Sequence, residues 1–355
     1  MATTAYLSKE KMKDLLKVLS EKHQLFVPCL EDDVVLFQLF NPEKNLCFDR
    51  PANSSPKTII FSQCEQLFSF KFKKEPDNPQ KTSIELKENL EYPPTIIFGA
   101  RPCDAKGFMI IDRVYIETDM ADPYYRGRRE KTTIISLSCP TPYVGCFCTS
   151  VGGGPADKAG SDILMTELEK GYFLEAITEK GEALLREPLF EDGGSYIDKA
   201  ENIRKACYTM VEKPFSDDEP GKKPLPRFHE DTFWEQEGNR CISCGACTYL
   251  CPTCYCFNIT DEQTANTGER IRTWDACMFH HFTLEASGHN PRPAKYGRLK
   301  NRVGHKFLYY PEKYNGVIAC SGCGRCIRYC PVSISISNVV ASLKKDTRES
   351  IDDKG

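Results

Sequence analysis

The chain has 355 residues, which exceeds the usual size of one domain and is enough to bury a substantial core. Lysine and arginine total 47 against 50 acidic residues, and the formal charge of -3 argues against a general nucleic-acid binder held by phosphate neutralisation. Nineteen cysteines are too many for an ordinary intracellular protein, yet the N-terminus lacks the apolar region of a secretory signal and no apolar run is long enough to cross a bilayer. We therefore expect a cytoplasmic protein without a membrane span, whose cysteines do metal or redox work because disulfides do not persist in a reducing compartment.

The first two hundred or so residues alternate apolar, polar and helical segments. Residues 8–22 have a helical period that places four apolar side chains on one face: Met12, Leu15, Leu16 and Leu19. Short apolar runs follow at 33–40, 58–62, 95–100 and 132–138, and helical patterns occupy 161–170, 172–185 and 196–213. This alternation predicts an α/β layer, and a segment rich in proline and charge at 212–228 predicts a linker.

Two cysteine runs, at 241–251 and 320–330, share the spacing Cys-x2-Cys-x2-Cys-x3-Cys-Pro. Three thiolates spaced by two residues can wrap three corners of one iron–sulfur cubane, and Gly245, Gly322 and Gly324 permit the tight turns between them. In two-cluster ferredoxins the fourth cysteine serves the other cluster. The runs therefore predict two [4Fe-4S] clusters, one on Cys241, Cys244, Cys247 and Cys330 and the other on Cys320, Cys323, Cys326 and Cys251. Structural zinc, the alternative, leaves the doubled eight-cysteine arrangement unexplained.

The runs complete the predicted organisation, which is of the α+β class. We expect an α/β domain over 1–225, a mostly α-helical ferredoxin-like domain with two [4Fe-4S] clusters over 226–345, and a flexible tail over 346–355. Pro252 and Pro331 are expected in the first turn of a helix after each run, because the missing amide costs nothing there.

The insert between the runs adds aromatic, basic and thiol side chains. Residues 270–290 are dense in aromatic side chains and are expected to form a helix that covers the clusters. Cys277 beside His280 and His281 could form a metal corner or simply pack, and the roles of Cys254 and Cys256 stay equally open. A basic stretch could dock an acidic redox partner, offset the negative clusters or form a solvated face: Arg292, Lys295, Arg298, Lys300, Arg302 and Lys306.

A second group of cysteines lies in the N-terminal part. Cys103 follows the run at 95–100 and Cys139 follows the run at 132–138, so both thiols meet at one sheet edge if these strands are parallel neighbours. With Cys146 and Cys148 they can hold a third [4Fe-4S] cluster, while reduced core cysteines or a zinc site are the alternatives. Four other cysteines are isolated in sequence and receive no chemical role: Cys29, Cys47, Cys64 and Cys207.

No substrate site is evident. The glycines at 152–154 are followed by residues that break Gly-x-Gly-x-x-Gly at Asp157, and the chain has no P-loop, nucleophile elbow, HExxH helix or haem-attachment pattern. We assign no catalytic residue.

Several motifs together carry a resemblance to a known family: RPCD around Cys103, the Cys139, Cys146 and Cys148 group followed by GGGP, the two ferredoxin runs, and TWDAC between them. From about residue 25 to 340 the chain resembles the iron–sulfur β subunit of cytoplasmic sulfhydrogenases and the corresponding iron–sulfur subunit of anaerobic sulfite reductases. The resemblance implies a subunit that passes single electrons between a flavin subunit, which handles a nicotinamide or similar donor, and a catalytic subunit that reduces protons or sulfur compounds. It also implies that the cysteines of the two runs are the cluster ligands.

We therefore expect an iron–sulfur electron-transfer subunit of a multisubunit oxidoreductase, with a flavin-containing input subunit and a catalytic hydrogenase or sulfite, sulfur or disulfide reductase as partners, and with no nucleic acid bound. No flavin is expected on this chain. The alternative is a self-contained reductase that binds flavin or substrate at the edge near Cys103 and Cys139. A redox sensor that gates a partner is a third reading, disfavoured by the absence of a DNA-binding motif.

Overall fold

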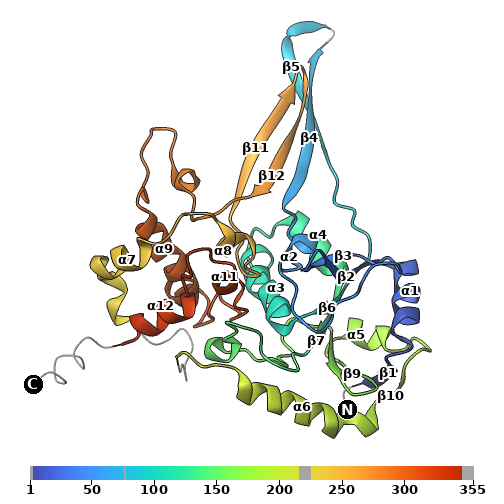
Figure 1. Cartoon of the computed structure of the whole chain (residues 1–355). Helices are drawn as coiled ribbons and strands as arrows, with labels where there is room; N and C mark the ends of the chain where they lie inside the picture. Colours follow the sequence, from blue (N-terminus) through green and yellow to red (C-terminus); the bar gives the residue numbers. More distant parts are fainter. Residues whose placement is uncertain (1–2, 76, 216–224, 346–355) are drawn as a thin grey trace, which may run out of the picture.

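The computed structural model describes residues 3–75, 77–215 and 225–345. Figure 1 shows a sheet with flanking helices, a cysteine-rich part beside it, and a long β arm that projects from between them. Helices and strands both contribute, which confirms the predicted α+β class. The predicted tail, 346–355, lies outside the described residues, as does 216–224 of the predicted linker.

An eight-stranded sheet organises the N-terminal part. Its central strands β2, β6, β7 and β8 are parallel, and antiparallel strands flank them on both sides. In spatial order the strands are β10 (Glu191–Asp192), β1 (Thr4–Ser8), β9 (Gly171–Ala176), β8 (Ile163–Glu167), β7 (Thr132–Leu137), β6 (Thr95–Ala100), β2 (Gln24–Glu31) and β3 (Val34–Leu39). The expected parallel pairing of the runs at 95–100 and 132–138 is confirmed.

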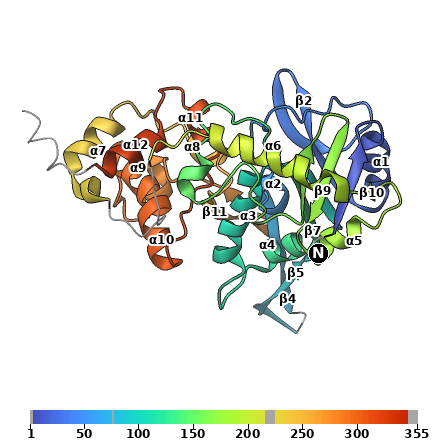
Figure 2. The same ribbon diagram turned by 90° about the horizontal axis from the view of Figure 1, so that it is seen from below.

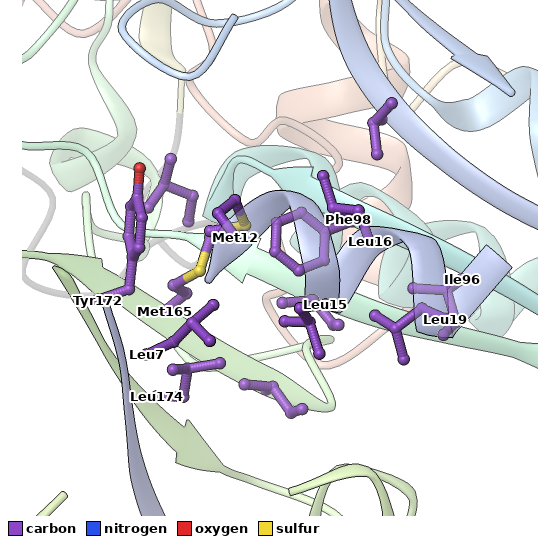
Figure 3. Packing of buried hydrophobic residues seen from close by; sticks show 14 of the residues in the cluster. Leu7, Met12, Leu15, Leu16, Leu19, Ile96, Phe98, Met165, Tyr172 and Leu174 are labelled. Atoms are coloured by element: carbon purple, nitrogen blue, oxygen red, sulfur yellow. The ribbon is translucent and has the colours of Figure 1, made fainter. Parts of the chain in front are cut away.

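Alternate side chains of the central strands feed two apolar layers. One face packs on α1 (Met12–Lys22), whose predicted apolar stripe of Met12, Leu15, Leu16 and Leu19 is buried against Phe98 (Figure 3). The other face, with Ile97 and Ile134, packs on α3 (Pro102–Tyr115) and α4 (Pro123–Lys131). Because both faces are covered, β6 is buried along its whole length.

Three segments of the N-terminal part differ from their sequence patterns. Residues 161–170, expected to be helical, form β8, and the segment 172–185 divides into β9 and the short helix α5 (Glu179–Leu184). Both strands are buried on two faces, so the alternation that identifies a strand is missing. The apolar run at 58–62 contributes α2 (Lys57–Ile60) instead of a strand. The helix expected at 196–213 is confirmed as α6 (Ile197–Met210), which Figure 2 shows running from the sheet toward the cysteine-rich part.

The β arm is a four-stranded antiparallel sheet built from two segments that lie far apart in the chain. It contains β11 (Phe257–Thr264), β12 (Thr267–Trp274), β4 (Cys64–Glu75) and β5 (Asn78–Glu88), with β12 paired to β4. The boundary near residue 225 stays a prediction, and this sheet joins strands from both sides of it.

The cysteine-rich part has short helices and is not mostly helical, because β11 and β12 belong to it. Its helices are α7 (Asp231–Gly238), α8 (Ala246–Tyr249), α9 (Lys295–Gly304), α10 (Tyr310–Lys313), α11 (Arg325–Arg328) and α12 (Ile336–Leu343). One-turn segments complete the chain at Cys148–Val151, Gly194–Tyr196, Pro226–His229 and His280–Thr283, with a π-helical turn at His305–Tyr309. Across the described part of the chain, no helix has both the length and the apolar character needed to cross a membrane.

Two expectations for this part are wrong. Neither proline begins a helix: the residues after Pro252 lead into β11, and α12 begins only at Ile336, after Pro331. The aromatic segment 270–290 is mostly irregular after β12, although Met278 in it is buried in the wall of a cysteine-lined cavity. At the start of this segment, up to Trp274, long-range pairing of β12 with β4 overrides the local helical pattern.

Candidate metal centres

Each cysteine run folds into a tight loop followed by one helical turn. Left-handed backbone angles make these turns, at Ser243, Gly245, Gly322 and Gly324. The amide of Ser243 lies 3.4 Å from the sulfur of Cys241, and the amide of Gly322 lies 3.4 Å from the sulfur of Cys320. The loops therefore aim backbone N–H groups at their own thiols, as iron–sulfur loops require.

The fold brings each group of three thiols together with the fourth cysteine of the other run. One cavity is lined by Cys241, Cys244, Cys247 and Cys330. We call it the outer cavity, because Cys244 and its neighbour Ile242 are exposed. A second cavity, the inner cavity, is lined by Cys320, Cys323, Cys326 and Cys251. This is the crossed arrangement that the spacing predicts, while the assignment of these thiols as ligands stays a prediction.

Buried donors face both cavities. Arg302 lines the two of them, and its Nε has no hydrogen-bond partner within the described residues. Ser321, in the inner wall, has a buried Oγ that is equally unpartnered there. An unpaired buried donor costs roughly 1–3 kcal/mol, so these groups fit cavities whose contents accept hydrogen bonds. The sulfurs of a [4Fe-4S] cluster are such acceptors, and the residues present therefore fit that group.

Three buried cations are spaced four residues apart here, and two of them, Arg302 and Lys306, line the cavities. Arg298 bonds the carbonyl of Met278 at 2.9 Å, Arg302 bonds the carbonyl of Cys247 at 3.1 Å, and the Nζ of Lys306 lies 3.4 Å from the sulfur of Cys251. Burial opposes the charge of Lys306, but the thiols of Cys251 and Cys254 outweigh it and raise the pKa of this lysine. Half of the basic stretch is therefore turned inward, where it offsets negative charge.

Three further thiols lie near the crossed groups, Cys254 beside Cys251 and Cys277 beside Cys256 and Cys247. Cys254 is buried, and its carbonyl accepts a hydrogen bond from Lys57 at 2.8 Å. A hydrogen bond with Cys277 lowers the pKa of Cys256. Within the described ranges, no three His, Cys, Asp or Glu side chains gather around a single metal ion, and this holds for Cys277 with its neighbouring histidines.

Lys57 is a residue of this site that sequence spacing does not identify. Burial lowers its pKa to about 8, and its Nζ lies 4.0 Å from the centre of the Trp274 ring. The signal is tertiary, because α2 carries Lys57 to a cysteine almost two hundred residues later in the chain.

The N-terminal cysteines lie where the sheet meets the inner cavity. Cys103 stands in the first turn of α3, directly after β6, and Cys139 follows β7, with its amide bonded to the carbonyl of Pro155 at 2.8 Å. The segment with Cys146 and Cys148 packs on the second cysteine run: the amide of Phe147 bonds the carbonyl of Gly322 at 2.9 Å. These thiols therefore adjoin the inner cavity.

A buried ion pair joins the two parts at this point. Arg325 of α11 holds Asp104 of α3 through two bonds of 2.6 and 3.0 Å, and both side chains are 1% exposed. Close packing continues along α3, where Gly107 leaves no room for a Cβ beside Pro252. Sequence spacing does not predict that Arg325 and Asp104 meet.

Comparison with known proteins agrees with this geometry. Residues 240–334 match a family model described as a 4Fe-4S dicluster domain. The chain is also 32% identical over 260 residues to the sulfhydrogenase 2 subunit beta of Pyrococcus furiosus, an alignment that covers 70% of this chain and 74% of that protein. The chain belongs to the family of sulfhydrogenase β subunits. Membership confirms the resemblance inferred from the motifs, and the dicluster match supports [4Fe-4S] clusters in this family member. No solved structure matches the chain.

Proposed function

We propose that this chain is a cytoplasmic iron–sulfur subunit that relays single electrons between a flavin-containing subunit and a catalytic hydrogenase or a sulfite, sulfur or disulfide reductase. The proposal is supported above all by one observation: the two crossed cysteine groups line adjacent cavities that share Arg302 and Cys326. Because electron tunnelling falls steeply with distance, two redox sites with a common wall suit electron transfer.

The ligands in this proposal are those of the two cavities. Cys241, Cys244, Cys247 and Cys330 hold one [4Fe-4S] cluster, and Cys320, Cys323, Cys326 and Cys251 hold the other. Such clusters accept and release one electron at a time. Arg302 and Lys306 lie beside the thiolates and favour the more negative, reduced state, while apolar neighbours such as Leu299 keep water out.

The route continues on either side of the crossed pair. The thiols of Cys139, Cys146 and Cys148 adjoin the inner cavity and supply a third [4Fe-4S] site. At the other end, the exposed Ile242 and Cys244 mark the point where the outer cavity comes closest to solvent. An electron entering at the sheet edge would leave through this surface, where we place a partner subunit.

The test uses the full chain purified without oxygen. We expect about eight to twelve iron and as many acid-labile sulfides per chain, and an EPR signal after reduction by dithionite. Once excess dithionite is removed, oxidised methyl viologen should take up about one electron per cluster. The isolated chain should neither evolve hydrogen nor reduce sulfite from reduced viologen. Zinc without sulfide, or substrate turnover by the chain alone, would contradict the proposal.

The rival function, a self-contained flavin or substrate reductase, has one feature in its favour. A surface hollow beside the third thiol group is lined by three cations, Lys158, Arg204 and Lys205, against two carboxylates, Asp157 and Glu201, and this small positive excess would suit a phosphate. Two of these cations are already engaged, because Lys158 and Arg204 both pair with Glu175. Flavin that copurifies with the chain in stoichiometric amount would favour the rival.

A further inference from the structure

Five cysteines, one more than the sequence pattern names, gather at the carboxyl edge of the large sheet. The fifth is Cys207 of α6, which is fully buried. Cys139 and Cys146 lie close enough to Cys207 to affect its pKa, which burial chiefly raises, to about 12. The same neighbours surround Cys148, whose pKa burial raises to about 12, with contributions from Cys139, Cys146 and Cys207. Cys139, Cys146, Cys148 and Cys207 therefore form one group of mutual neighbours.

The fold places Cys207 in this group through fixed contacts of α6. The buried face of the helix repeats at helical spacing, with Ala200, Arg204 and Cys207. Arg204 anchors that face to the sheet: its Nε bonds Thr166 of β8 at 2.9 Å, and its guanidinium pairs with Glu175 of β9 at 2.9 Å. One residue after Cys207, Tyr208 packs against Gly154 in the loop that follows Cys148. The helix therefore lies against the loop that follows Cys148, and Thr149, Gly154, Arg204 and Tyr208 line one hollow there.

Cys103 lies on the other side of Cys139, nearer the inner cavity. Burial raises its pKa, followed by the charges of Asp104 and Cys323, and Cys139 contributes less than either. It shares the first turn of α3 with Asp104, which is engaged by Arg325. The main charged neighbours of Cys103 thus include Cys323 and Arg325 of the second run but neither Cys146 nor Cys148.

Buried donors without partners accompany this thiol group as they do the two crossed cavities. The hydroxyl groups of Thr149 and Ser150, directly after Cys148, are buried and have no hydrogen-bond partner among the described residues. Their cost is relieved if the site holds sulfur acceptors, whereas a group of reduced apolar core cysteines would leave them unpaired.

We propose that Cys207 is the fourth ligand of a third [4Fe-4S] cluster, together with Cys139, Cys146 and Cys148, and that Cys103 is not a ligand. This inference rests on the proposed electron-transfer function and names the ligands of its third site. Because Cys207 lies more than fifty residues beyond Cys148, no local spacing identifies it.

The test compares iron and acid-labile sulfide in the full chain, purified without oxygen, for C207A, C103A and the wild type. We expect about twelve iron per chain in the wild type and in C103A, and one to four fewer in C207A. If C207A loses only one iron, its oxidised form should show the EPR signal of a three-iron cluster. C29A is the matched control, because Cys29 is equally buried but lies in the apolar core of the sheet. If C207A lowers the yield of folded chain, C207S keeps the side-chain volume and gives the same count.

The outcomes separate the inference from the function on which it rests. Iron lost in C103A but kept in C207A would assign the site to Cys103 and overturn the inference. About eight iron in the wild type would also overturn it, since the third site would be empty, while the two crossed clusters and the electron-transfer function would stand. Chains without sulfide would contradict both.

Discussion

The two parts of the molecule are stabilised in different ways. In the sheet part, strands such as β6 and β8 are buried between apolar layers, and the core is built of leucine, isoleucine and phenylalanine. In the cysteine-rich part, α8 and α11 are single turns, too short to be stable alone, and three cations are buried beside the thiols: Arg302, Lys306 and Arg325. A sheet can fold on apolar burial alone, whereas buried cations need counter-charges, which the thiolates of a bound cluster supply.

The largest expected effect is therefore that of removing iron. Chelation of the anaerobic chain should unfold the segments 241–251 and 320–343 while β6, β7 and β8 stay folded, because only the first two depend on metal ligands. Hydrogen exchange followed by mass spectrometry measures both parts in one sample. Equal protection of the two parts before and after chelation would show that the cysteine-rich part does not need its clusters.

Removing one crossed ligand tests how the two runs depend on each other. C330A should lose about four iron per chain, from the site of the first run. Adding C247A should cost no further cluster, while adding C323A should cost about four more iron, because that thiol belongs to the other site. C64A serves as control, since Cys64 is exposed on β4. If C330A and C323A removed the same cluster, each run would serve its own site.

The ion pair between the parts provides the next test. D104N should lower the free energy of unfolding by about 3–5 kcal/mol, because it leaves Arg325 buried without its counter-charge. The matched control is D261N, which removes an equally close pair with Arg270 on the exposed arm and should change stability very little. Chemical denaturation of the anaerobic chain compares them. A D104N variant as stable as D261N would mean that the interface does not depend on this pair.

The smallest expected effect concerns the charge beside the inner cavity. K306M should lower the reduction potential of the inner cluster by on the order of 50–100 mV, as expected for one charge removed about 8 Å away at an effective dielectric constant near 20. A redox titration followed by EPR measures it. K300M removes a lysine of α9 that pairs with Asp231 at the surface, and it should leave the potential unchanged. Equal shifts in the two variants would point to a general charge effect.

Features that depend on local spacing could be predicted from the sequence. The stripe of α1, the buried strands β6 and β7, and the tight cysteine loops all follow from residues within one or two turns of each other. The crossed grouping of the eight thiols was also predictable, because a Cys-x2-Cys-x2-Cys loop leaves its fourth cysteine beyond reach of the same cube.

Features that depend on contacts between distant residues are visible only in the folded structure. β8 has no strand alternation because it is buried on both faces, and β12 pairs with β4, about two hundred residues earlier in the chain. In the same way, α6 carries Cys207 to Cys139 and Cys146, and α2 carries Lys57 to Cys254. Local spacing does not predict these contacts, because each depends on how helices and strands pack over the whole chain.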